Sequence, residues 1–319
     1  MSAGRADAYG LLAQLLRQEV DAAMLEYLRT DRQFRAALPA GDPEAALRQL
    51  SAEYARLFCI DLSPYASVFL DDEVLLLTDT STAVEDQYQA SAFVPDASWR
   101  VAAPDHVAVE FAYMQALCAA EHGEESAAAR EAQACFLVEH LIAWLPALAL
   151  ATRRTARLPF YPLLLDSAVE LALDHRNELA PSRTEATAGP SPDPSGGGVP
   201  GLAEAALGDV AAFLTTPAHC GLFLAHADLL HIAAGIDVPL GRSSRRQQVR
   251  QLFEEAARFE VLSALLAALE QLVRDELAAY AGWSARYPQA QRALQPARIR
   301  LQRLQASLHA METAACSPR

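Results

Sequence analysis

The amino-acid sequence predicts an all-α protein. Hydrophobic residues make up 52% of the 319 positions, and alanine and leucine dominate them while valine and isoleucine are scarce. This balance favours helices over sheets. Apolar residues recur at helical spacing along most of the chain. Strand-like patterning occurs only around Val74–Leu77, which we interpret as part of a helix or an extended turn. The length is sufficient to bury one large core or two smaller ones.

The first part of the chain carries seven predicted helices. One face of the first, residues 5–18, holds Tyr9, Leu12, Leu15 and Leu16. The others cover residues 21–37, 43–60, 81–90, 105–121, 124–150 and 160–179. Pro104 precedes the helix at 105–121, and Asp105 is available as its N-cap.

A change of composition after residue 180 predicts a linker. Residues 181–201 contain five prolines and five glycines and almost no large apolar side chain. Such a segment cannot bury enough surface to become ordered. Helical patterning resumes at 202–214, 225–235, 243–256, 258–281 and 289–311. We therefore predict a helical domain at 1–180, a disordered linker at 181–201 and a second helical segment at 202–319.

The net charge of −14 is confined to the first part of the chain. Residues 1–180 hold 27 acidic residues against 13 arginines, whereas residues 181–319 hold 13 of each. An acidic domain repels nucleic acid and anionic lipid, and it attracts basic peptides at long range. The simpler interpretation, which charge alone favours, is that acidity keeps the protein soluble.

Cysteine usage and the N-terminus indicate a cytoplasmic protein. The five cysteines are odd in number and form no C-x-x-C motif, which is typical of a reducing compartment. We expect Cys59, Cys118 and Cys135 to be buried thiols because they lie in apolar stretches. The first residues are polar and lack the apolar core of a signal peptide, and no apolar run approaches the length of a membrane span.

The segment Ala103–Glu110 is the strongest candidate for a functional element. An aspartate at a helix N-terminus accepts backbone N–H bonds, and the following His106 is expected to point outward from the first turn. Glu110 lies four residues after His106, so the two side chains can share a helix face. They could clamp a guanidinium group or a peptide backbone. Taken alone, the segment is more simply an ordinary N-cap with a solvated histidine.

Three motifs together resemble the TorD/DmsD/NarJ family of chaperones, which help to mature molybdenum enzymes. The run Glu53-Tyr54-Ala55-Arg56-Leu57-Phe58 precedes Tyr65-Ala66-Ser67-Val68-Phe69, which is similar to the family's aromatic loop. Pro104-Asp105-His106, followed by Glu110, resembles the family's P-x-D-H turn. Phe136 to Pro146 resembles its F-x-x-x-H-L-x-x-W-x-P helix. The order and spacing of these elements, within residues 1–175, carry the resemblance.

Two positions depart from the family pattern. Ala66 stands where the family usually has glutamate or glycine, so a carboxylate contact expected there is missing. Ala103 replaces the usual acidic residue before the proline of the P-x-D-H turn. These departures leave the details of recognition open.

The resemblance implies a TorD-like helical bundle with a C-terminal helical extension, and a chaperone instead of an enzyme. Its groove would bind the N-terminal, twin-arginine type signal of a molybdenum-cofactor oxidoreductase and delay export until the cofactor is inserted. The implied peptide-binding residues are Tyr65, Ser67, Phe69, Asp105, His106 and Glu110. Aromatic rings offer cation–π surfaces, and carboxylates offer bidentate pairing with arginine. No bound cofactor or metal is implied. Indirect handling of the molybdenum cofactor, guanine-nucleotide binding and a dimer stay open.

Two other functions remain as alternatives. One is a helical adaptor or scaffold that acts through the C-terminal helices. The other is a hydrolase without a recognised motif that uses Asp105, His106 and Glu110. The histidines of the second segment carry little weight, because His226 and His231 are five residues apart and so about 140° apart around a helix.

Overall fold

The computed structural model describes residues 2–72, 78–96, 99, 101, 103–121, 126–179 and 205–316. Throughout these residues the regular elements are helices, and the one β-type pairing is an isolated antiparallel bridge between Tyr65 and His106. The predicted all-α fold is confirmed. The strand-like pattern at Val74–Leu77 and the predicted linker at 181–201 both lie outside the described residues.

The chain divides into two compact units, Met1–Leu179 and Ala180–Arg319, called unit 1 and unit 2 below. The three-part division predicted from composition remains a prediction, because its middle part is not among the described residues. Each unit is therefore considered by itself.

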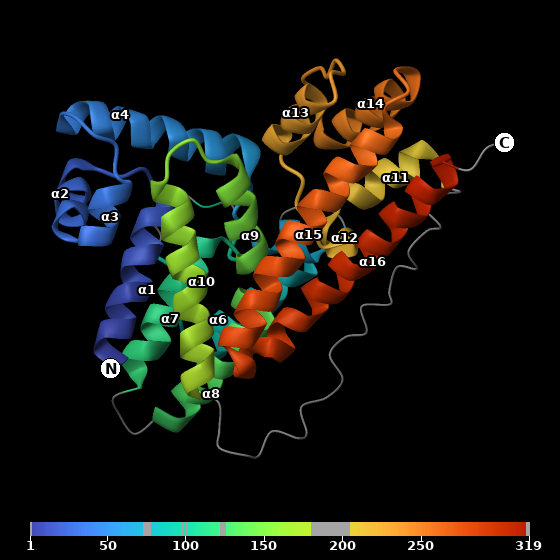
Figure 1. Ribbon diagram of the computed structural model, residues 1–319. Coiled ribbons are helices and arrows are strands. Elements are labelled where there is room, and N and C mark those ends of the chain that lie inside the picture. Colours follow the sequence, from blue (N-terminus) through green and yellow to red (C-terminus); the bar gives the residue numbers. More distant parts are fainter. Residues whose placement is uncertain are drawn as a thin grey trace. The chain divides into compact units, whose positions relative to one another are not determined.

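Unit 1 is a bundle in which α1 packs along α7 and α9 packs along α10 (Figure 1). Its elements are α1 (Ser2–Arg17), α2 (Ala22–Thr30), α3 (Arg32–Ala37), α4 (Pro43–Tyr54), the π-helix η1 (Ala55–Asp61), α5 (Ala66–Leu70), α6 (Asp79–Ala90), α7 (Val107–Ala120), α8 (Ser126–Phe136), the π-helix η2 (Leu137–Leu141), α9 (Ile142–Thr155) and α10 (Phe160–Leu179). Helix α7 is apolar nearly all round, as expected of a helix enclosed by its neighbours.

Three of the predicted helices are interrupted, the one at 124–150 by the π-helix η2 and the other two as follows. The helix predicted at 21–37 breaks at Asp31, whose carboxylate accepts the backbone N–H groups of Gln33 and Phe34 and so caps α3. The helix predicted at 43–60 changes from α-type to π-type hydrogen bonding after Tyr54. Periodicity alone did not indicate either change.

The helical run Ser126–Thr155 forms part of the core. It is the one run in the described part of the chain that is long and apolar enough to cross a membrane, and 72% of its most apolar window is buried inside the protein. Pro146 lies in its second half, inside α9 and five residues after the last residue of the π-helix η2. Because proline lacks an N–H, the usual helical hydrogen-bond pattern is interrupted there as well.

Unit 2 is built on the long pair α15 and α16, which lie side by side (Figure 1). Its elements are α11 (Leu207–Leu214), α12 (Pro217–Cys220), α13 (His226–Gly235), α14 (Arg245–Arg258), α15 (Leu262–Arg286), the 3-10 turn η4 (Pro288–Ala290) and α16 (Gln291–Cys316). Gly221 ends α12 with φ of 77°, and a Cβ there would lie 2.9 Å from the Cβ of Arg300. Both observations require glycine at this contact.

The four cysteines whose side chains are described are free thiols. Cys118 is buried, as predicted, and Cys135 is half-buried. The prediction was wrong for Cys59, which is exposed near the end of η1. An apolar sequence neighbourhood does not fix which side of a helix meets solvent, and this position faces outward.

Candidate functional site

The six candidate residues meet at one junction in unit 1, which joins α5, α6, α7 and α9. Backbone hydrogen bonds hold the two key loops together. The N–H of Ala66 donates to the carbonyl of Asp105 at 3.0 Å, and the N–H of Val107 donates to the carbonyl of Pro64 at 2.9 Å. This pairing is the isolated bridge between Tyr65 and His106. The aromatic loop and the P-x-D-H turn are therefore parts of one structure.

Asp105 is fully buried and caps a neighbouring helix, not its own. Its Oδ2 accepts the backbone N–H of Ser67 in the first turn of α5 at 2.8 Å, and its Oδ1 accepts the hydroxyl of Ser81 in α6 at 2.7 Å. The prediction that Asp105 caps the helix following it was wrong. Helix α7 begins at Val107 with His106 as its N-cap. The carboxylate instead satisfies donors of two segments distant in the sequence.

His106 is 5% exposed, so the expectation that it points outward was also wrong. Its Nδ1 accepts the backbone N–H of Ala108 at 3.1 Å, which places the ring proton on Nε2. Burial lowers the pKa of His106 to about 4, although the nearby charge of Asp105 opposes that change. The ring of Tyr65 meets it edge-on with 4.9 Å between centroids. His106 is therefore a neutral packing and capping group at pH 7.

Glu110 is fully buried in the first turn of α7. The indole N–H of Trp144 donates to its Oε2 at 3.1 Å, while its Oε1 has no hydrogen-bond partner. Burial raises the pKa of Glu110 well above its ordinary value, the charge of Asp105 raises it further, and the Trp144 bond opposes both. Burial therefore favours the protonated form of Glu110.

Phe69, Ser67 and Tyr65, the remaining candidate residues, lie at the same junction. Phe69 contacts Trp144, with ring centroids 5.3 Å apart. The hydroxyl oxygen of Ser67 is buried without a hydrogen-bond partner, whereas Tyr65 is only half-buried. Tyr65 is consequently the candidate side chain that is most accessible to another molecule.

Sequence reasoning missed three contributors to the junction, Ser81, Tyr88 and Trp144. Ser81 donates to Asp105, and the hydroxyl of Tyr88 donates to the carbonyl of Pro104 at 3.0 Å. Their seven-residue separation places both on one face of α6, which was the available signal. Trp144 was noted in a helix motif, but nothing in its spacing indicated Glu110 as its partner.

The geometry changes the chemical interpretation of the junction. Asp105 and Glu110 were expected to offer open carboxylates for arginine, yet both are buried and bonded within unit 1. Asp105, His106 and Glu110 each bond to a different group, and no hydrogen bond joins their side chains to one another. That arrangement lacks the nucleophile–base contact expected of a catalytic set. The peptide-binding role of the six residues stays a prediction.

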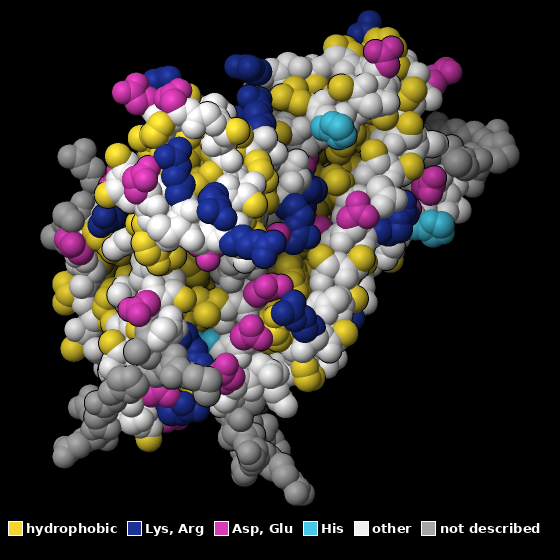
Figure 2. All heavy atoms as spheres, turned by 60° about the vertical axis from the view of Figure 1, so that its left-hand side comes forward, with side chains coloured by type: hydrophobic (Ala, Val, Ile, Leu, Met, Phe, Trp, Pro, Cys, Tyr) yellow, Lys and Arg dark blue, Asp and Glu magenta, His cyan; other side chains and the backbone are white. Residues whose placement is uncertain are grey.

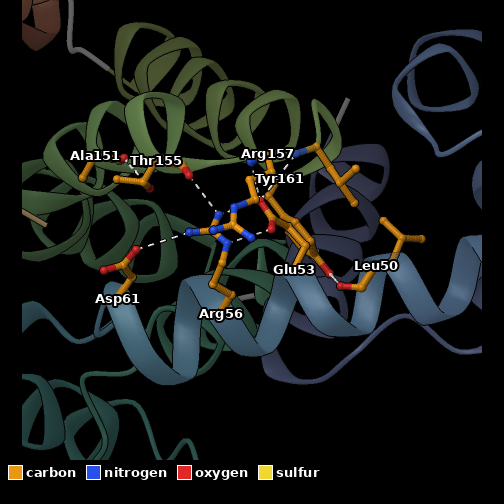
Figure 3. A network of polar contacts seen from close by, with 9 residues as sticks. Leu50, Glu53, Arg56, Asp61, Ala151, Thr155, Arg157 and Tyr161 are labelled. Atoms are coloured by element: carbon orange, nitrogen blue, oxygen red, sulfur yellow. Dashed lines mark hydrogen bonds and ion pairs between the residues drawn. The ribbon is translucent and has the colours of Figure 1, made fainter. Parts of the chain in front are cut away.

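The Glu53-Tyr54-Ala55-Arg56 motif forms a second polar network (Figure 3). Arg56 binds both carboxylate oxygens of Glu53, at 2.7 and 2.9 Å, and donates to the carbonyl of Thr155 at 2.9 Å. Glu53 also accepts the backbone N–H of Arg157 at 2.5 Å. Burial opposes ionisation of Glu53, but the bonds from Arg56 and Arg157 prevail and lower its pKa. The network attaches the end of α4 to the turn between α9 and α10.

We expect Arg56→Met to reduce the free energy of unfolding by about 2 kcal/mol. The variant leaves the buried Glu53 carboxylate and the Thr155 carbonyl without this donor, and a partly buried pair contributes less than a fully enclosed one. Urea unfolding of the full chain measures the loss. Arg48→Met is the matched control, since Arg48 lies on α4 in an exposed pair with Glu44. An equal effect from both substitutions would contradict the role given to the network.

On the face seen in Figure 2, the acidic side chains form no single patch, and arginines and apolar side chains lie between them. The acidic excess belongs to residues 1–180. Its effect on a basic partner is therefore a general long-range attraction.

Comparison with known proteins finds a match to one family model. Residues 12–149 match the model of the nitrate reductase delta subunit family. This match supports the family resemblance for unit 1 and does not extend to the C-terminal helices. The family consists of molybdoenzyme maturation chaperones, which work with molybdoenzyme catalytic subunits and are not catalysts. Neither a curated protein nor a solved structure matches the chain significantly.

Proposed function

We propose that this protein is a cytoplasmic chaperone that binds the N-terminal, twin-arginine type signal of a molybdenum-cofactor oxidoreductase. Binding would mask the signal and delay export until the cofactor is inserted. The observation that carries the proposal is the match of residues 12–149 to a maturation-chaperone family, because this span contains every residue of the α5–α7 junction.

Within this proposal the junction residues have two kinds of role. Tyr65 is the contact residue, since its half-buried ring offers an apolar and cation–π surface to an arginine-containing peptide. Asp105 and His106 are positioning residues, because Asp105 accepts the N–H of Ser67 and the His106 ring packs against Tyr65. Glu110 acts less directly, because it bonds to Trp144, which contacts Phe69. Ser67 and Phe69 anchor the other end of that loop. The negative charge of residues 1–180 raises the encounter rate with a basic peptide.

Replacing Tyr65 with alanine is expected to weaken binding of a fluorescent twin-arginine signal peptide by about tenfold or more. Removing an aromatic contact from the centre of a binding surface typically has an effect of this size. Fluorescence anisotropy with the full chain gives the dissociation constant, and a peptide with both arginines replaced by glutamine tests dependence on the arginine pair.

Tyr27→Ala provides the matched control, because Tyr27 is exposed on α2 of the same unit. Urea unfolding of both variants shows whether the fold is retained. If Tyr65→Ala remains folded and binds the peptide as tightly as the Tyr27 variant, Tyr65 is not the contact residue. If the unaltered protein does not distinguish the two peptides, the proposed ligand class is wrong.

A further inference from the structure

We propose that Glu270, His309 and Glu312 of unit 2 form a binding site for a divalent transition-metal ion of the Zn²⁺ type. The three residues each offer one ligand atom, and these atoms all lie within 4.8 Å of one another. The proposal concerns the C-terminal helices, which the family match does not cover.

The hairpin geometry brings these residues together. Helices α15 and α16 are joined by the short turn Pro288–Ala290. Glu270 precedes the turn by nearly the same number of residues as His309 follows it, so the two face each other across the pair. Glu312 lies three residues after His309 on the same face of α16. A pair spaced i, i+3 on one helix plus a carboxylate from its neighbour is a recurrent arrangement for metal ligands in helical bundles.

Glu270 supplies an independent indication of a ligand. The residue is only 9% exposed, and its Oε1 is enclosed without a hydrogen-bond partner. That oxygen lies 3.9 Å from Nδ1 of His309, beyond hydrogen-bond distance. Its other oxygen, Oε2, accepts from Arg274 at 3.0 Å. Arg274 thus orients the carboxylate and leaves Oε1 facing the cluster. Partners that bond to a metal ligand commonly orient it in this way.

The ligand set selects the class of ion. One imidazole nitrogen and two carboxylate oxygens suit Zn²⁺ and neighbouring first-row ions, whereas Ca²⁺ and Mg²⁺ prefer oxygen ligands alone. The two carboxylates balance the charge of a divalent ion. Bonds of about 2 Å in a tetrahedral site place ligand atoms about 3.3 Å apart, so the donor atoms, now within 4.8 Å of one another, must approach by up to about 1.5 Å. The His309 side chain is 74% exposed and can rotate to make that approach.

Binding would cross-link α15 to the last part of α16. Three protein ligands leave a fourth position for water, so the site resembles an open zinc centre in ligand number. Its expected consequence for this protein is mechanical, because an ion held by both helices opposes separation of the hairpin end.

Calorimetric titration of the full-length, chelator-treated protein with Zn²⁺ tests the site. One ion should bind with an affinity that falls about tenfold or more in His309→Ala and in Glu312→Gln, since removing a ligand costs at least as much as removing a second-shell partner. Co²⁺ bound at the same place should show ligand-field absorption without a thiolate charge-transfer band. The unfolding temperature should rise with Zn²⁺ in the unaltered protein and change less in either variant.

His231→Ala is the matched control, because His231 is exposed in the same unit and outside the cluster. It should bind Zn²⁺ like the unaltered protein. The proposal is overturned if the unaltered protein binds no Zn²⁺, if His309→Ala and Glu312→Gln bind it with unchanged affinity, or if the bound Co²⁺ shows sulfur ligation. Because His309 is exposed, replacing it should leave the fold intact. The unfolding curve of the variant checks that it does.

Discussion

Asp105→Ala is expected to reduce the free energy of unfolding of unit 1 by about 4 kcal/mol, because a hydrogen bond to a buried carboxylate contributes roughly 1.5–3 kcal/mol and two are lost. The N–H of Ser67 and the hydroxyl of Ser81 would both remain buried without this acceptor. The α5 helix would also lose the carboxylate that accepts a backbone N–H of its first turn. The α5–α7 junction should therefore open before the rest of the unit unfolds.

The measurement is urea unfolding monitored by the fluorescence of Trp144, which is buried in this unit. Replacing Trp99 and Trp283 with phenylalanine in all samples leaves Trp144 as the sole tryptophan, since the chain has three. Asp86→Ala is the control, because Asp86 is exposed on α6. Its effect should stay within about 0.5 kcal/mol.

Ser81→Ala provides a milder test if Asp105→Ala does not fold at all. It removes one of the two donors to Asp105 and should cost about 1 kcal/mol. A loss of less than about 1 kcal/mol in Asp105→Ala itself would mean that the two hydrogen bonds do not form.

We expect the free energy of unfolding of the Glu110→Gln variant to rise steadily relative to that of the unaltered protein as the pH increases above 4.5, the ordinary pKa of this carboxyl. Burial raises the pKa of Glu110 in the folded protein, so above pH 4.5 the unfolded chain releases a proton that the folded chain retains. The stability that the protonated Glu110 contributes is therefore fully present below pH 4.5. It is lost as the pH rises through the pKa of Glu110 in the folded protein. The limiting slope is about 1.4 kcal/mol per pH unit.

Glutamine removes the titration while keeping an oxygen to accept the indole N–H of Trp144. We would measure the difference in unfolding free energy between the two proteins from pH 5 to pH 8. This difference separates the effect of Glu110 titration from that of the buried histidines, which both proteins share. This separation is necessary because burial lowers the pKa of His106 to about 4, which makes the folded protein less stable as pH falls below 6.5. Parallel pH profiles for the two proteins would show that Glu110 is ionised in the fold.

Much of the fold follows from local features of the chain. Helical periodicity and proline positions located most of the helices, because the apolar spacing that buries a helix face is visible within one segment. Short α5 was missed, since five residues are too few to display a period. The break at Asp31 and the π-turns were missed because they depend on single hydrogen bonds, not on composition.

For the candidate site, too, the sequence predicted some features and tertiary packing decided others. The motifs alone associated Tyr65, Asp105 and Glu110 with one functional element, and the structure brings all three to the same junction. They could not show which of these side chains remains accessible. A helix-start aspartate can cap its own helix or another, and the choice depends on whether a donor such as Ser67 is brought within reach.

The amino-acid sequence was therefore sufficient to establish the helical class, the acidic first part and the family resemblance, since composition, period and motif spacing are properties of the chain itself. Tertiary packing alone decided that Asp105 caps α5, that Glu110 is enclosed against Trp144, and that Glu270 faces His309. Burial and the identity of a hydrogen-bond partner depend on residues far apart in the chain. Those contacts set the pKa and accessibility of each group, and with them its chemical role.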